Sequence, residues 1–97
     1  MGSYRLSRRA ESDLEEIWDY TETTWSANQA ETYLDGLFSC FQSIADGKAK
    51  AKPIEAVRKG YYKTLCVKHN IFFRKGSDHN TEIIRVLHVS MDIELHL

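Results

Sequence analysis

Two stretches of helical periodicity, joined by a short polar segment, constrain the fold of this chain more than any other feature. In the first stretch one stripe recurs every three or four residues, at Ala10, Leu14, Ile17, Trp18, Thr21 and Trp25. Ser7 stands before the stripe as a suitable N-cap, so we expect a helix over residues 8–24. The two tryptophans are expected in the core, and Tyr20 lies at the flank of the stripe.

The second stretch begins at Ser26, which together with Gln29 has the spacing of a capping box. A wide apolar arc follows, made of Ala30, Tyr33, Leu34, Leu37, Phe38, Phe41, Ile44 and Ala45. Asp46-Gly47 ends it. Two amphipathic helices with so short a connection predict an antiparallel hairpin.

The remaining segments have the character of strands. A short alternating run at 4–7 precedes the first helix, and a polar, lysine-rich connection over 48–60 follows the second, with a possible helical turn at 54–57. Three runs rich in β-branched and aromatic residues come next, at 61–67, 71–74 and 81–89. Their short connections predict an antiparallel meander. Residues 91–97 form either a short helix or a tail across the sheet.

This order predicts one α+β domain over residues 1–97, a two-layer β-α-α-β-β-β arrangement. The helix hairpin packs on one face of a mainly antiparallel sheet, and the other face is left open. No apolar run approaches the ~20 residues that span a bilayer, and the N-terminus lacks the apolar segment of a signal peptide. We expect a cytoplasmic protein.

Charge is unevenly distributed along the chain. Residues 1–45 carry three basic and eight acidic side chains, whereas residues 46–97 carry ten basic and six acidic ones. An acidic and a basic face that meet different partners would explain the asymmetry, and so would ordinary surface scatter. The near-neutral total argues against a chain that coats nucleic acid.

Cysteine and histidine spacing gives no sign of a metal or cofactor site. Cys40 and Cys66 lie in apolar periodic segments without a second cysteine nearby, so we expect buried free thiols. His88 and His96 are eight residues apart, which is not the spacing of two ligands on one helical turn.

Two long motifs resemble the ParE toxins of the RelE/ParE superfamily. The first is Tyr4-Arg-Leu-Ser, then Ala10-x-x-Asp13-Leu14-x-x-Ile17-x-x-Tyr20-Thr21, then Trp25-x-x-x-Gln29-Ala30-x-x-Tyr33. The second is His69-x-Ile71-Phe72-Phe73-Arg74, then Ile84-Arg85-Val86-Leu87-His88-x-x-Met91-Asp92-x-x-x-His96-Leu97. Together they cover most of the chain. The family's central Gly-x-Arg is missing, since Gly60-Tyr61-Tyr62 stands there, although Arg58 and Lys59 lie just upstream.

The resemblance implies a toxin that performs no chemistry, inhibits DNA gyrase and is neutralised by a ParD-like antitoxin. The DNA-cleaving subunit of gyrase is expected to contact Arg85, His88, Met91, Asp92, Leu95 and His96. The antitoxin is expected to contact Trp18, Tyr20, Arg58, Arg74 and Arg85. Because a charge that points inward from a strand is costly, Arg74 and Arg85 are expected on the open sheet face or at an edge. Neither sequence-specific nucleic-acid binding nor membrane binding is implied.

Two alternatives stay open. RelE-like members of the superfamily resemble ribosome-dependent ribonucleases, and RNA cleavage needs a base, an acid and phosphate clamps. Such an assembly would use Glu55 as base, His88 as acid and the arginines at 58, 74 and 85 as clamps. The near-neutral charge and the C-terminal motif favour the non-nuclease branch. The other alternative is a toxin that has lost its target contact and only binds an antitoxin.

Overall fold

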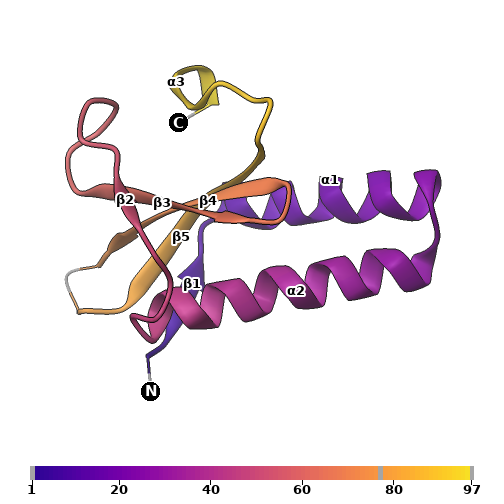
Figure 1. The fold of residues 1–97 in the computed structure, drawn as a ribbon, viewed down its shortest axis with the longest axis horizontal. Coiled ribbons are helices and arrows are strands. Elements are labelled where there is room, and N and C mark those ends of the chain that lie inside the picture. Colours follow the sequence, from indigo (N-terminus) through magenta and orange to yellow (C-terminus); the bar gives the residue numbers. More distant parts are fainter. Residues whose placement is uncertain (1, 77, 97) are drawn as a thin grey trace.

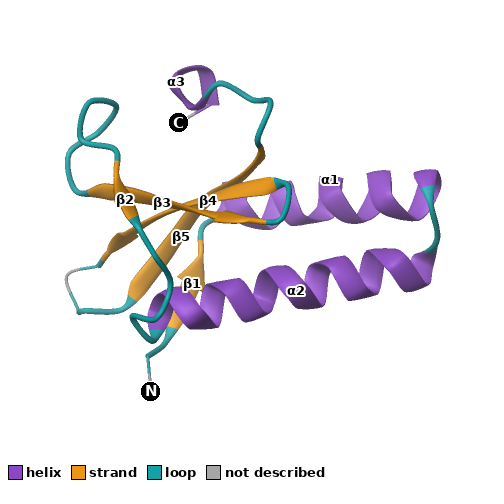
Figure 2. Cartoon of the chain, viewed as in Figure 1, coloured by secondary structure: helices purple, strands orange, loops and turns teal. Residues whose placement is uncertain are grey.

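The computed structural model describes residues 2–76 and 78–96, and of residues 94 and 95 the backbone only. The elements follow one another as β1 (Tyr4–Leu6), α1 (Arg8–Thr24), α2 (Ala27–Ala45), β2 (Lys52–Pro53), β3 (Tyr61–Cys66), β4 (His69–Lys75), β5 (Thr81–His88) and α3 (Ile93–His96). Figures 1 and 2 show the two long helices side by side against one face of a twisted sheet. The predicted two-layer α+β arrangement is confirmed.

Local capping sets the bounds of both long helices. The Ser7 hydroxyl accepts a hydrogen bond from the Ala10 N–H at 3.0 Å, and α1 covers the predicted residues 8–24. The Ser26 hydroxyl accepts one from the Gln29 N–H at 3.1 Å and starts α2. Beyond α2, Gly47 adopts φ 74°, a left-handed conformation in which glycine has no Cβ penalty.

The sheet contains five strands in the order β1-β5-β4-β3-β2. β1 is parallel to β5, and the other pairs are antiparallel, with a register shift between Phe72 and Phe73. The strand β2 corrects the sequence-based expectation, in which the segment 48–60 is a connection that does not pair with the sheet. β2 is only Lys52 and Pro53, a pair without strand propensity, and it forms because β3 offers a free edge.

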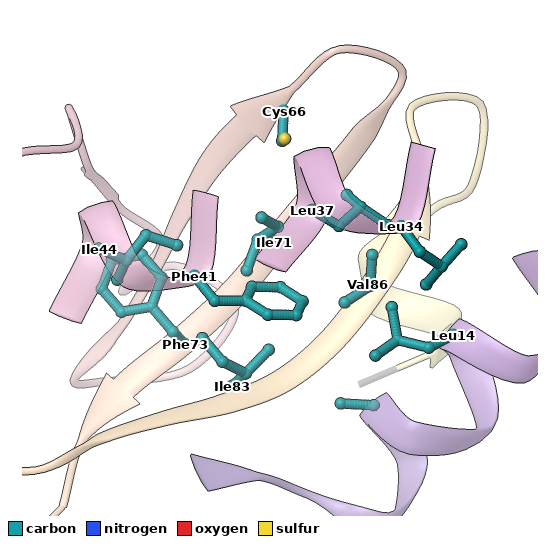
Figure 3. Packing of buried hydrophobic residues seen from close by; sticks show 11 residues of the cluster. Leu14, Leu34, Leu37, Phe41, Ile44, Cys66, Ile71, Phe73, Ile83 and Val86 are labelled. Carbon is teal, nitrogen blue, oxygen red and sulfur yellow. The ribbon is translucent and has the colours of Figure 1, made fainter. Parts of the chain in front are cut away.

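The main core fills the space between the hairpin and the sheet. Leu37, Phe41, Ile71 and Ile83 are almost completely buried, and Figure 3 shows how the side chains from α2 meet those from β4 and β5. Burial of each large apolar side chain contributes about 1.5–3 kcal/mol. The apolar stripes of the two helices therefore pack against the sheet, as their periodicity predicts.

The other face of the sheet is not left open, which corrects the sequence-based expectation. Phe72 points away from its neighbours Ile71 and Phe73, which belong to the main core. A second, smaller cluster forms on that side from Ile54, Tyr61, Phe72 and Leu87, with Ile84 and Ile93 packed against it. Ile54 and Ile93 come from the connection after β2 and from α3. These two segments are too short to give an amphipathic signal in the sequence.

Cys40 and Cys66 form a disulfide, so the prediction of two free thiols is wrong. Cys40 lies on α2 and Cys66 ends β3, with 6.5 Å between the two Cα atoms. That separation lies in the usual range for a disulfide. The two residues are 26 positions apart. Their proximity follows from the packing of α2 on the sheet, which the spacing alone does not report.

The hairpin extends beyond the sheet (Figure 1), and residues 22–29 at its far end are exposed. Trp25, expected in the core, and Tyr20 are each 68% exposed. Trp18 and Tyr33 are half-buried and packed against the main core, as expected. The apolar stripe thus continues past the point where α1 still has a sheet beneath it. No described helix is both long and apolar enough to cross a membrane.

Candidate functional site

Arg85 lies at the centre of a polar cluster that joins the two ends of the chain. Its Nε and Nη2 donate to the two carboxylate oxygens of Asp13, each at 2.8 Å. Its Nη1 donates to the backbone carbonyl of His96. All three nitrogens of the guanidinium are therefore bound within the protein.

The ion pair is buried, which corrects the placement of Arg85 on an open face or at an edge. Only 11% of the Arg85 side chain and 7% of the Asp13 side chain remain exposed. Bidentate hydrogen bonds compensate the loss of water that makes an inward charge costly. These bonds to the Asp13 carboxylate raise the pKa of Arg85 above its ordinary value, and they outweigh burial, which lowers that pKa.

Asp13 also closes the edge of β5. β1 covers β5 only as far as Ile83, and beyond that point the strand edge would be bare. The Ser7 N–H and hydroxyl donate to the carbonyls of Ile83 and Ile84, and the Asp13 carboxylate accepts the Val86 N–H at 2.9 Å. The first turns of α1 thus replace the missing strand.

The C-terminal helix α3 is attached to this cluster by two arginines. The His96 carbonyl accepts hydrogen bonds from Arg85 and from Nη2 of Arg9, the latter at 2.7 Å. Ile93 packs against the second core cluster. Arg9 and Asp13 were not among the predicted site residues. The signal that could have found Asp13 is its place beside Ala10 and Leu14 on the buried stripe, where an acidic residue needs a buried partner.

The residues predicted to contact gyrase lie at or near the end of β5 and in the segment after it. Met91 and Asp92 are exposed, and His96 is half-buried. His88 ends β5, where its Nδ1 is hydrogen-bonded to the Ser90 hydroxyl at 2.8 Å. Arg85 is bound to Asp13, and the side chain of Leu95 lies outside the described residues. The structure thus places the exposed members after β5 and Arg85 inside.

The residues predicted to contact the antitoxin do not form one cluster. Trp18 and Tyr20 lie on α1, and Arg85 is buried beneath that helix. Arg58 and Arg74 lie over the ring of Tyr61, with 5.4 and 6.0 Å between guanidinium carbon and ring centroid. Arg74 is exposed and forms an ion pair with Glu82 at 2.7 Å.

A second polar group surrounds His69, on strand β4. The hydroxyl of Tyr33 is hydrogen-bonded to Nδ1 of His69 at 2.5 Å, and the ring of His88 meets the His69 ring edge-on. Burial, followed by the charge of His88, lowers the pKa of His69 to about 4. Burial also raises the pKa of Tyr33. At neutral pH both side chains are uncharged, so this group joins α2 to the sheet without an ion pair.

Of the residues that RNA cleavage would use, Arg85 is engaged within the protein. Arg85 is bound by Asp13 and His96, while Glu55 is exposed in the turn after β2. Within the described ranges, no three His, Cys, Asp or Glu side chains come close enough to hold a metal ion. A shallow groove of about 170 Å³ lies between α2 and β3, lined by Ser39, Cys40, Ser43, Ala49, Thr64 and Leu65. Neither Arg85 nor His88 borders it.

Known proteins match this chain along almost its whole length. The family model "ParE toxin of type II toxin-antitoxin system, parDE" matches residues 4–93. Toxin ParE1 of Caulobacter vibrioides is 42% identical over 97 residues, covering 100% of this chain and 99% of that protein. Toxin ParE1 of Mycobacterium tuberculosis is 35% identical over 94 residues, covering 97% and 96%.

Two solved structures share the fold. A structure of the chromosomal ParDE system from P. aeruginosa has a TM-score of 0.78 at 18% identity, covering 92% of this chain and 97% of that chain. The RelBE2 toxin-antitoxin complex of Mycobacterium tuberculosis has a TM-score of 0.57 at 16% identity, covering 90% and 96%. At these identities the likeness concerns the fold alone.

Proposed function

The chain belongs to the ParE toxin family of type II toxin–antitoxin systems, and we propose that it stops growth by binding DNA gyrase, through the DNA-cleaving subunit, and preventing religation of the cut DNA. The break is made by gyrase, so the toxin needs no nucleophile of its own. We further propose that a ParD-like antitoxin neutralises it and that both act in the cytoplasm, where gyrase works.

The state of Arg85 carries the proposal of a binder rather than a nuclease. A phosphate clamp must present free guanidinium N–H groups to the substrate. Each nitrogen of Arg85 instead donates a hydrogen bond to Asp13 or to the His96 carbonyl, and only 11% of the side chain is exposed, so Arg85 has little to present to a phosphate. Arg85 holds the C-terminal helix in place through the His96 carbonyl. Met91 and Asp92, which precede that helix, are exposed on the surface.

The hydrogen bonds that hold α3 also support a target contact in the C-terminal segment. Met91 is a flexible apolar side chain, 46% exposed, next to an acidic residue. Exposed methionine adapts to the shape of a partner surface. Because Arg9 and Arg85 fix the backbone of α3, this segment is ordered before it meets gyrase, which lowers the entropic cost of binding.

The antitoxin contact is supported by the exposed aromatic residues of the hairpin. Tyr20 and Trp25 are large apolar side chains on the surface near the end of α1. Side chains of this kind anchor partner helices in grooves. Arg58 and Arg74 on the other side of the molecule offer donors to acidic residues of an antitoxin tail.

The deciding experiment is a gyrase supercoiling and cleavage assay with the purified chain, with and without the antitoxin encoded beside its gene. We expect cleaved plasmid to accumulate and the antitoxin to abolish the effect. Met91→Ala should weaken it, whereas Val67→Ala, an exposed apolar residue in the turn after β3, should not. Codon-specific cuts in ribosome-bound messenger RNA, lost in His88→Ala and without any change in DNA topology, would establish the RelE-like alternative.

A further inference from the structure

The edge of the sheet formed by β2 and β3 carries an unbalanced concentration of basic side chains. Residues 47–63 contain six basic residues and one acidic residue, Glu55. We define the basic edge as Lys50, Lys52, Lys59 and Lys63; all are exposed except Lys63, which is half-buried. Arg58, which the proposed function gives to the antitoxin contact, is not included. Lys48 has the carboxylate of Asp46 as a neighbouring charge and is set apart. None of the ion pairs found in the described part of the chain includes a residue of the basic edge.

Two of these lysines are held opposite each other by the backbone. Lys52 of β2 and Lys63 of β3 are paired across the strands. The neighbouring Thr64 hydroxyl donates to the Lys50 carbonyl at 2.7 Å, which fastens the chain that leads into β2. Like charges directly opposite on two strands destabilise a sheet. The fold therefore keeps an unfavourable pair of charges that an anion placed between them would relieve.

The composition of the edge favours a phosphate backbone over an acidic protein segment. The cores of protein interfaces are depleted in lysine, and their strongest contacts come from tryptophan, tyrosine and arginine. Lysine dominates the basic edge, with Lys52 on β2 and Lys63 on β3. The residues that flank Lys52, Ala51 and Pro53, offer little apolar surface. Phosphate contacts need only a suitably spaced set of cations.

We propose that the basic edge binds the phosphate backbone of DNA without reading its sequence. This inference deepens the proposed function and rests on it, because the gyrase intermediate contains the DNA that the edge would contact. Acidic residues exposed along α1 would orient the toxin relative to the DNA; they are Glu11, Glu15, Glu16, Asp19 and Glu22. β2 forms one edge of the sheet, and α1 packs against β5 near the other (Figure 1). DNA is attracted to the first side and repelled from the second, so the toxin meets it in one orientation.

The test measures binding of a labelled DNA duplex of about two helical turns by fluorescence anisotropy over a range of salt concentrations, with no gyrase present. The variant is Lys52→Gln with Lys63→Gln. Its matched control is Arg8→Gln with Lys68→Gln, which removes the same charge from exposed positions at the start of α1 and in the β3–β4 turn. Each phosphate-contacting lysine contributes about 1 to the slope of log affinity against log salt. We expect the slope to fall by about 2 in the variant and to stay unchanged in the control.

Thermal unfolding distinguishes a binding role from a structural one. Because the variant removes a like-charge pair, it should unfold at the same temperature as the parent or slightly above it at low salt. A lower unfolding temperature would show that the lysines support the sheet and would overturn the inference. Equal slopes for variant and parent, or an equal loss in the control, would overturn it as well.

Two further measurements decide between partners and between proposals. Polyglutamate should bind more weakly than the duplex; if it binds as tightly and loses the same slope in the variant, the edge is a site for acidic polypeptides. Gyrase cleavage is measured separately with the same proteins. If the lysine pair binds DNA but gyrase is not inhibited, the proposed function is refuted and the DNA-binding role of the basic edge is still supported. Full gyrase inhibition without DNA binding refutes the edge alone.

Discussion

Asp13 and Arg85, 72 residues apart in the sequence, form a buried bidentate ion pair with both N–O distances at 2.8 Å. The pair connects α1 to the strand β5, and a third nitrogen of Arg85 extends the connection to α3. One side chain thus joins the first helix, the sheet and the C-terminal helix. Loss of either partner should affect stability and the presentation of the C-terminal segment together.

Asp13→Ala should destabilise the protein by about 3–5 kcal/mol, because it leaves the buried guanidinium unpaired. Urea unfolding at neutral pH measures this loss. Replacement of both residues by apolar ones, Asp13→Leu with Arg85→Met, should cost less than Asp13→Ala alone, since no buried charge remains. Glu82→Ala is the control: it breaks exposed ion pairs and should cost about 1 kcal/mol or less. Equal costs for Asp13→Ala and Glu82→Ala would contradict the assignment.

Arg9→Ala should loosen α3 with little effect on global stability. Arg9 is exposed, and its Nη2 donates to the His96 carbonyl at 2.7 Å. Without this bond the backbone amides of residues 91–96 should exchange with solvent several times faster, since end segments unfold locally at low cost. Hydrogen exchange by mass spectrometry provides the measurement. Arg8→Ala, at the neighbouring exposed position, should leave that exchange unchanged.

Stability should decrease as the pH falls from about 6.5 to about 4, because His69 titrates in that interval. Its pKa is about 4 in the folded protein and 6.5 in an ordinary environment. Between these values the unfolded chain binds more protons than the folded chain, so acid favours unfolding. The groups that face His69 are Tyr33, His88 and Asp13. Urea unfolding at several pH values should show the slope.

His69→Gln should flatten the pH dependence in this interval. Asp46 and Asp78 do not interfere, because hydrogen bonds hold the pKa of each below 3.8: from the Gly2 N–H to Asp46 and from the Asn80 N–H to Asp78. The stability that these carboxylates contribute is lost only in more acidic solution. An undiminished slope in His69→Gln would assign the effect to another group.

The Cys40–Cys66 disulfide should stabilise the isolated protein under oxidising conditions. It closes a loop over a sequence separation of 26 residues, for which chain entropy gives about 3–4 kcal/mol. We expect Cys40→Ser with Cys66→Ser to unfold at lower urea concentration than the oxidised parent and close to the parent in reductant. In a reducing cytoplasm the thiol form would be the working form. Equal midpoints for oxidised and reduced parent would contradict a stabilising disulfide.

The helices were predictable because their signals are local. Ser7 and Ser26 cap within three residues, and the apolar stripe of each helix needs no knowledge of the rest of the chain. Trp25 shows where the local signal ends. It continues the stripe of α1, yet the hairpin has passed the edge of the sheet by then (Figure 1), and the side chain is 68% exposed.

The parts that escaped prediction depend on contacts between distant residues. The place of Asp13 on the buried stripe calls for a buried partner without indicating which residue it is, and an arginine in a strand predicts exposure when considered alone. Only the contact between the two residues makes their burial favourable. The disulfide between Cys40 and Cys66 likewise depends on the meeting of two residues that are distant in the sequence. β2 needed the free edge of β3 to become a strand at all, and α3 needed the arginines at positions 9 and 85.

The parallel pairing of β1 with β5 has a consequence for the order of events during translation. Tyr4 is synthesised 77 residues before Thr81, the residue with which it pairs (81 − 4 = 77). At about 5–20 residues per second, several seconds pass before the N-terminal strand and Asp13 have a partner. The nascent polypeptide therefore cannot complete its sheet until β5 has been synthesised, and until then the edges of the other strands stay accessible to other proteins.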